Sequence, residues 1–127
     1  MKIISTGAKE WENRHQTFTE QIKDLFEIGN EPDLGALESY NDCTKGFQKM
    51  ISDAIKTNTP LRSLGAGWSW TKIATVKDGI MADTKPLNTT MSMSAESILG
   101  SYTGDLKKLI FAQCGNGVWE LSKELRP

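Results

Sequence analysis

The chain has 127 residues, of which 38% are hydrophobic and 24% are charged, and its formal net charge is −1. These values are typical of an ordinary globular protein, and a chain of this length buries roughly two-thirds of the surface that it exposes when unfolded. The basic residues are scattered along the sequence, which argues against a nucleic-acid-binding face. Composition therefore predicts one domain, or part of one, without a polyanionic partner.

No export signal, membrane span or metal site is predicted. Residues 1–7 offer only the apolar pair Ile3 and Ile4, where a secretory signal needs a run of about seven or more. No stretch approaches the roughly 20 apolar residues that cross a bilayer. The cysteines, Cys43 and Cys114, lie far apart, and His15 is the single histidine. We expect a cytoplasmic protein without a zinc site, in which Cys114 is a small buried hydrophobic residue.

The first 40 residues predict an extended arm followed by a helix. Residues 1–16 are mostly polar, and Trp11 is the side chain expected to pin this arm to the rest of the protein. From residue 17 onward, apolar residues recur at helical spacing, and the Gly-Asn-Glu-Pro sequence at 29–32 supplies a stop. The apolar residues of this predicted helix are Phe18, Ile22, Leu25 and Phe26.

A second helix is predicted over residues 41–56, and a buried strand follows it. Asn41 and Asp42 can cap this helix, and its apolar residues lie on one face. They are Phe47, Met50, Ile51, Ala54 and Ile55. Pro60 and the residues before it end the helix, so that residues 61–64 are predicted as a strand.

The rest of the chain predicts a strand, a hairpin and a final helix. Residues 79–83 form the strand, and residues 84–96 are expected to be a surface excursion. Segments 97–102 and 108–114 are predicted to pair through a turn at Gly104 and Asp105. Val118, Leu121 and Leu125 have the spacing of one helix face. Together these elements predict an α+β fold.

The sequence after the strand at 61–64 has the features of a phosphate-binding loop. Two glycines that flank an alanine permit positive φ and leave backbone N–H groups open to a ligand, as a pyrophosphate requires. A plain strand-to-turn junction is the alternative, because so short a motif occurs often by chance. Rossmann and Walker loops are excluded, since a third glycine and a Gly-Lys-Ser/Thr sequence are both missing. The loop consists of Gly65, Ala66, Gly67, Trp68, Ser69 and Trp70.

This arrangement resembles the amino-terminal part of the FAD-binding domain of the vanillyl-alcohol oxidase (PCMH-type) flavoprotein family, which includes aldonolactone and alditol oxidases. Residues 61–70 are similar to the family's Arg-x-x-Gly-x-Gly-His-Ser-aromatic loop, which holds the flavin pyrophosphate. The opening at residues 11–13, the segment at 78–83 and a second glycine segment at 112–117, followed by a helix, agree in order. The resemblance covers most of the chain.

The resemblance implies that backbone N–H groups of the loop and the Ser69 hydroxyl hold the pyrophosphate of FAD. The second segment, with Gly115, Asn116 and Gly117, is likewise implied to contact the cofactor. Trp68 stands where many members carry a histidine that attaches the flavin covalently, so FAD is expected to bind noncovalently. Trp68 and Trp70 are expected either to wedge under the loop or to contact FAD directly.

By this resemblance, residues 1–127 form the amino-terminal part of one FAD-binding domain. The arm and first helix occupy residues 1–40, the first subdomain with its small sheet and flanking helices occupies 41–95, and the second subdomain begins at 96–127. No catalytic residue is named, because in the family the residues that position the substrate come largely from the part that follows.

The implied function is that of the FAD-binding portion of a flavin-dependent oxidoreductase, which oxidises an alcohol or lactone by hydride transfer to flavin. A shortened noncatalytic member that acts as a binding or protein-interaction module is the alternative. Half a cofactor site implies weak or absent FAD binding by this chain alone. It also implies exposed apolar surface that a homodimer or a separate chain would cover.

Overall fold

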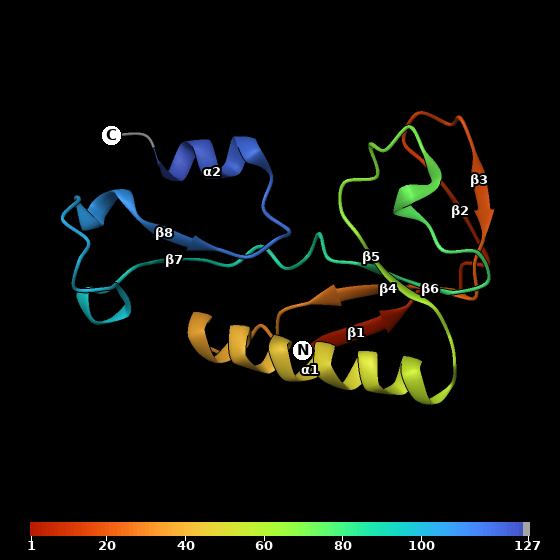
Figure 1. Cartoon of the computed structure of the whole chain (residues 1–127), viewed down its shortest axis with the longest axis horizontal. Coiled ribbons are helices and arrows are strands. Elements are labelled where there is room, and N and C mark those ends of the chain that lie inside the picture. Colours follow the sequence, from red (N-terminus) through yellow and green to blue (C-terminus); the bar gives the residue numbers. More distant parts are fainter. Residues whose placement is uncertain (126–127) are drawn as a thin grey trace.

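The computed structural model describes residues 1–125, and its centre is a four-stranded sheet of order β1-β4-β6-β5 (Figure 1). The central strand β6 pairs in parallel with both β4 and β5, whereas β1 pairs antiparallel with β4. The carboxyl ends of three strands therefore meet at one edge of the sheet. The bounds are Lys2–Ser5 for β1, Asp24–Gly29 for β4, Leu61–Leu64 for β5 and Ile80–Asp83 for β6.

Helix α1 (Ala36–Lys56) covers one face of this sheet (Figure 1). Ile28 of β4, Ala82 of β6 and Cys43 of α1 are buried together with Leu87 in one apolar cluster. The side chain of Phe26 packs against the same cluster. This helix and the two parallel strands β5 and β6 that follow it form the scaffold from which the glycine loop projects.

Helix α1 begins earlier than predicted. Gly35 is its N-cap and the helix starts at Ala36, whereas the sequence places the start at the Asn41-Asp42 cap. Asp42 lies inside the helix, where its carboxylate forms an ion pair with the amino group of Met1. Glu31 lies 3.6 Å from the same amino group. Asp42 therefore does not cap the helix, and its carboxylate instead links α1 to the amino terminus.

A second apolar cluster lies on the opposite face of the sheet. Leu25 of β4 contacts this cluster, while its neighbour Phe26 contacts the first, as alternation along a strand requires. The buried members of the second cluster are Ile22, Leu64 and Met81. Trp11 packs against them, so the prediction that it pins the amino-terminal arm is confirmed. A hairpin of β2 (Glu10–Glu12) and β3 (Thr19–Gln21), with the short helix η1 (Lys72–Ala74), adjoins this cluster.

The helix predicted from residue 17 is wrong, because this segment forms β3, a turn and β4. Both faces of β4 are covered, so its consecutive apolar residues do not show the alternation of a half-exposed strand. The apolar positions then coincide with helical spacing by chance. Ile22 contributes to the core from the turn between the strands, not from a helix face.

Beyond the main sheet, the chain forms a carboxyl-terminal segment of two strands and a helix. Strand β7 (Thr90–Ser92) pairs antiparallel with β8 (Ile110–Ala112), and Met91 lies opposite Phe111. The predicted partner strand at 97–102 is wrong, since only the short helices η2 (Ala95–Ser97) and η3 (Leu106–Lys108) interrupt the connection. The expected excursion at 84–96 supplies β7 instead. Helix α2 (Val118–Glu124) confirms the final predicted helix.

The predicted α+β class is confirmed by these small sheets and two α-helices. The strands expected at residues 61–64 and 79–83 are also confirmed, the second one beginning at Ile80. In the described part of the chain, neither helix combines the length and the apolar character that crossing a membrane requires.

Replacing Ile28 by alanine is expected to destabilise the protein by about 2–5 kcal/mol, because Ile28 is fully buried between β4 and α1. Ile55→Ala is the matched control, since 74% of Ile55 is exposed and its loss should change stability by less than about 1 kcal/mol. Urea denaturation followed by circular dichroism measures both. Equal losses in the two variants would contradict the assignment of the core.

Candidate functional site

The glycine loop Gly65–Trp70 leaves the sheet at the carboxyl end of β5. The carbonyl oxygen of Leu64, the last residue of β5, accepts hydrogen bonds of 3.2 Å from both the backbone N–H and the side-chain hydroxyl of Thr84. Thr84 is buried and follows β6 directly. The start of the loop is thus fixed to the end of the neighbouring parallel strand, where α/β sheets commonly bind ligands.

The amino-terminal arm holds the carbonyl groups of the loop. The Arg14 backbone N–H donates to the carbonyl oxygen of Gly67, and Arg14 Nε donates to that of Ala66, both at 3.1 Å. Asn13 Nδ2 donates to the carbonyl oxygen of Ser69 at 3.0 Å. Asn13 is itself buried, and its Oδ1 accepts from the N–H of Thr17 at 2.9 Å. Three loop carbonyls therefore have partners within the protein.

The backbone N–H groups of the same loop have no acceptor in the part of the chain that the structure describes. Among residues 1–125, none accepts a hydrogen bond from the backbone N–H groups of Gly65 through Trp70. Gly67 has φ of +74°, which a residue with a side chain rarely adopts. At Gly65 a Cβ atom would meet nothing within 4 Å, so space lies open beside the backbone. Unpaired N–H groups beside open space are what an anion-binding loop provides.

The Ser69 hydroxyl is engaged within the loop. It donates to the carbonyl oxygen of Thr71 at 2.8 Å and accepts from the Thr71 N–H at 3.2 Å. Contact with a phosphate would require this hydroxyl to exchange its acceptor. The predicted contact through the Ser69 side chain stays a prediction, and the N–H groups are the donors that the structure leaves ready.

The two loop tryptophans lie on the surface. Trp68 is 58% exposed and Trp70 is 68% exposed, so the expectation that they wedge under the loop is wrong. His15 stacks on Trp70 with ring centroids 3.7 Å apart, and its ring lies 5.2 Å from that of Trp68. The Arg14 guanidinium lies over Trp68, 5.3 Å from the ring centroid. Direct contact of either tryptophan with a cofactor stays a prediction.

The second glycine segment packs against the turn that follows β6. A Cβ atom on Gly115 would lie 2.4 Å from the carbonyl oxygen of Lys85 and 2.5 Å from those of Thr84 and Leu87. Only glycine permits so close an approach. Thr84 also donates to Leu64, so the second glycine segment lies at the same edge of the sheet as the start of the loop.

The N–H groups of this second segment already have partners. The Gly115 N–H donates to the carbonyl oxygen of Leu87 at 2.7 Å, and the Gly117 N–H donates to Glu120 Oε2 at 2.6 Å. Asn116 donates from its backbone to the carbonyl oxygen of Gln113 at 3.3 Å. Close packing is the role that the structure assigns to this segment, and its predicted contact with FAD stays a prediction.

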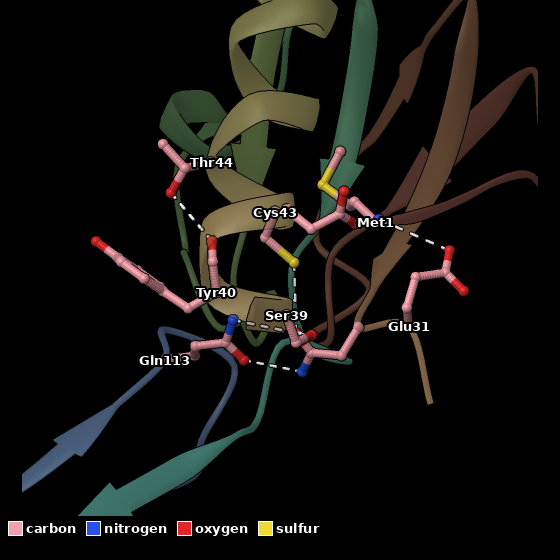
Figure 2. A network of polar contacts seen from close by, with 9 residues as sticks. Met1, Glu31, Ser39, Tyr40, Cys43, Thr44 and Gln113 are labelled. Carbon is pink, nitrogen blue, oxygen red and sulfur yellow. Dashed lines mark hydrogen bonds and ion pairs between the residues drawn. The ribbon is translucent and has the colours of Figure 1, made fainter. Parts of the chain in front are cut away.

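A polar network at the carboxyl end of β4 joins the sheet to α1 and β8 (Figure 2). Asn30 Oδ1 accepts from Ser39 Oγ at 3.0 Å, Cys43 Sγ at 3.3 Å and Gln113 Nε2 at 3.1 Å. Asn30 Nδ2 in turn donates to Gln113 Oε1 at 2.8 Å and Thr89 Oγ1 at 2.9 Å. No motif in the sequence signals this network, because its members are separated along the chain. The network anchors the pair of strands β7 and β8 to the main sheet.

The two cysteines differ in their environment. Cys43 is buried in this network, and burial raises the pKa of its thiol above the ordinary value. Cys114 is exposed, so the prediction of a buried residue there is wrong. It lies in the turn after β8 and directly follows Gln113, whose side chain bonds into the network.

Comparisons with known proteins give no match. No family model, curated protein or solved structure matches this chain.

Gly115→Ala is expected to destabilise the protein by about 3 kcal/mol, because the added methyl group meets three backbone oxygens that cannot move independently. Gly100→Ala is the matched control, since a Cβ there meets nothing within 4 Å, and its effect should be within about 0.5 kcal/mol. Urea denaturation measures the difference. A stable Gly115→Ala protein would refute the close packing of this segment.

In the folded protein, Cys114 is expected to react with a thiol reagent at least about tenfold faster than Cys43, since burial and a raised pKa both reduce the reactive thiolate of Cys43. Because burial raises the pKa of the Cys43 thiol, its reaction should still accelerate as the pH rises above the ordinary thiol range. Single Cys→Ser variants assign the two kinetic phases. Equal reaction rates of the two thiols at neutral pH would show that the reagent reaches Cys43 freely and would contradict its burial.

Proposed function

We propose that the loop Gly65–Trp70 binds the diphosphate of FAD, and that this chain is the amino-terminal part of a PCMH-type FAD-binding domain. The supporting observation is the asymmetry of the loop backbone. Its carbonyl groups at Ala66, Gly67 and Ser69 are bound by Asn13 and Arg14, while its N–H groups have no acceptor among residues 1–125. N–H groups without an internal acceptor attract an anion.

The order of elements supports the same proposal. Helix α1 leads into β5, the loop follows at once, and β6 pairs in parallel with β5. The second glycine segment returns to the same edge through Gly115. This is the order of elements on which the resemblance to the flavoprotein family rests, now with both glycine segments at one edge of a sheet.

The residues present fit a noncovalently bound FAD. Backbone N–H groups from Gly65 to Ser69 would hold the diphosphate, and the Arg14 guanidinium beside the loop would supply positive charge. Trp68 offers no nucleophile for covalent attachment. When bound, FAD supplies the capacity to accept a hydride from an alcohol or lactone substrate. The contribution of this chain is to bind the cofactor and to orient it through the diphosphate.

A noncatalytic protein-interaction module is the second candidate, and exposed apolar residues on α2 and at its end favour it. Val118 is 82% exposed, Trp119 62% and Leu125 53%, and all three belong to α2 or its end. In a complete flavoprotein such residues would be covered by the rest of the domain. In a module of this size they would instead contact a partner.

Gly65→Leu is expected to weaken FAD binding by about tenfold or more, because its side chain fills the open space beside the free N–H groups. Gly100→Leu is the control, since that position is equally open and lies outside the loop. Titration of the protein into FAD, followed by flavin fluorescence, measures affinity, and urea denaturation checks that both variants fold.

Two results would contradict the proposed function. One is FAD binding of equal strength in the wild type and Gly65→Leu. The other is the absence of saturable binding at millimolar FAD in a folded wild-type protein, because a loop that supplies the diphosphate contacts within this chain predicts weak binding, not absent binding. Loss of binding in Gly65→Leu alone supports the proposal.

The isolated chain is expected to associate, because Val118, Trp119 and Leu125 expose apolar surface on one short helix and its end. Light scattering coupled to gel filtration should give a mass above that of one chain, rising with concentration. The double variant Val118→Ser, Trp119→Ser should shift the mass toward the monomer. A monodisperse wild-type monomer at all concentrations would contradict this expectation.

A further inference from the structure

Aromatic and cationic side chains gather beside the glycine loop. His15 and Arg14 come from the turn after β2, and Trp68 and Trp70 come from the loop itself. His15 stacks on Trp70, with an angle of 13° between the rings, and meets Trp68 nearly edge-on at 63°. The cluster therefore joins two segments that are far apart in the sequence.

The ring of Trp70 is available for a further contact. One face stacks on His15 with the ring centroids 3.7 Å apart, yet 68% of the residue is exposed. Because His15 covers one face of the Trp70 ring, this large exposed fraction means that the other face is open to solvent. An open indole face next to donors for an anion is suited to a ligand that carries a planar ring.

The turn that carries His15 is held firmly. The Gln16 N–H donates to the carbonyl oxygen of Asn13 at 2.9 Å, and the Arg14 N–H donates to that of Gly67 at 3.1 Å. Asn13 is 2% exposed. Since the backbone on both sides of His15 is fixed, its ring supports Trp70 before any ligand binds, and this lowers the cost of ordering the site.

Arg14 adds charge at the same place. Its Nε donates to the carbonyl oxygen of Ala66, whereas its terminal nitrogens donate no hydrogen bond to residues 1–125. The guanidinium also lies over Trp68, so its positive charge adjoins both the ring cluster and the loop. Phosphate beside an aromatic ring is the ligand chemistry that this combination matches.

We infer that the open face of Trp70, supported by His15, stacks an aromatic ring that the loop's ligand carries on its phosphate. This inference rests on the proposed function, because the phosphate is placed by the same loop. Adenine and isoalloxazine, the two ring systems of FAD, share the required planar chemistry. ADP and FMN present them separately and so distinguish the two sources.

The test compares each aromatic ligand with a phosphate that lacks the ring. ADP is paired with pyrophosphate, and FMN with ribose 5-phosphate, and isothermal titration calorimetry gives the four affinities. At least one aromatic ligand should bind about tenfold more tightly than its ring-free counterpart, as stacking of one base typically provides. Trp70→Ala should abolish this difference and leave the ring-free phosphates unaffected.

Trp119→Ala is the matched control, because Trp119 is 62% exposed, lies on α2 and carries Lys123 over its ring at 4.1 Å. It should retain the tenfold difference. If aromatic and ring-free phosphates bind equally, or if Trp70→Ala leaves the difference unchanged, the stacking inference is overturned. Loss of binding in Gly65→Leu would in that case still uphold the proposed function. If Gly65→Leu leaves the affinities for all four ligands unchanged, the proposed function itself is overturned.

Discussion

Parallel pairing of β6 with both β4 and β5 determines where the candidate site lies. Three strand ends come to one edge of the sheet, and each is followed by a polar or glycine-containing segment. Asn30 follows β4, the glycine loop follows β5, and Thr84 follows β6. Thr84 then joins them, because it donates twice to Leu64 and lies against Gly115. Without this pairing the two glycine segments would not lie at the same edge of the sheet.

The two glycine segments serve different physical purposes. In the first, Asn13 and Arg14 hold three of the carbonyl groups, and the N–H groups have no acceptor among residues 1–125. In the second, Gly115 allows backbone to approach backbone, and the N–H groups are bonded within the protein. Glycine content alone therefore does not mark a ligand site. The partners of the flanking carbonyl and N–H groups decide which segment is open.

Local patterns predicted the elements with simple environments. Helix α1 has one exposed and one buried face, and strands β5 and β6 follow clear breaks, so all three could be placed from the sequence. Strand β4 could not, because Leu25 and Phe26 are covered on opposite faces and the alternation is lost. Strand β7 is only three residues long and pairs with β8 across a long connection, which no local pattern encodes.

The candidate site was predictable only in part for a similar reason. Gly65 and Gly67 lie two positions apart and form a local motif, so the sequence was enough to find them. Arg14 and His15 act from a distant turn, and a lone arginine or histidine in a polar arm carries no signal. Their roles depend on the contact of Asn13 and Arg14 with the loop, which is a tertiary interaction.

The central claim is that the backbone N–H groups of the loop bind the diphosphate of FAD. The most direct test is to record amide resonances of the isotopically labelled chain while FAD is added. The account predicts that the largest shifts fall on the amides of Gly65 through Ser69. Shifts confined to other segments, such as β7, β8 and α2, with the loop amides unmoved, would contradict it.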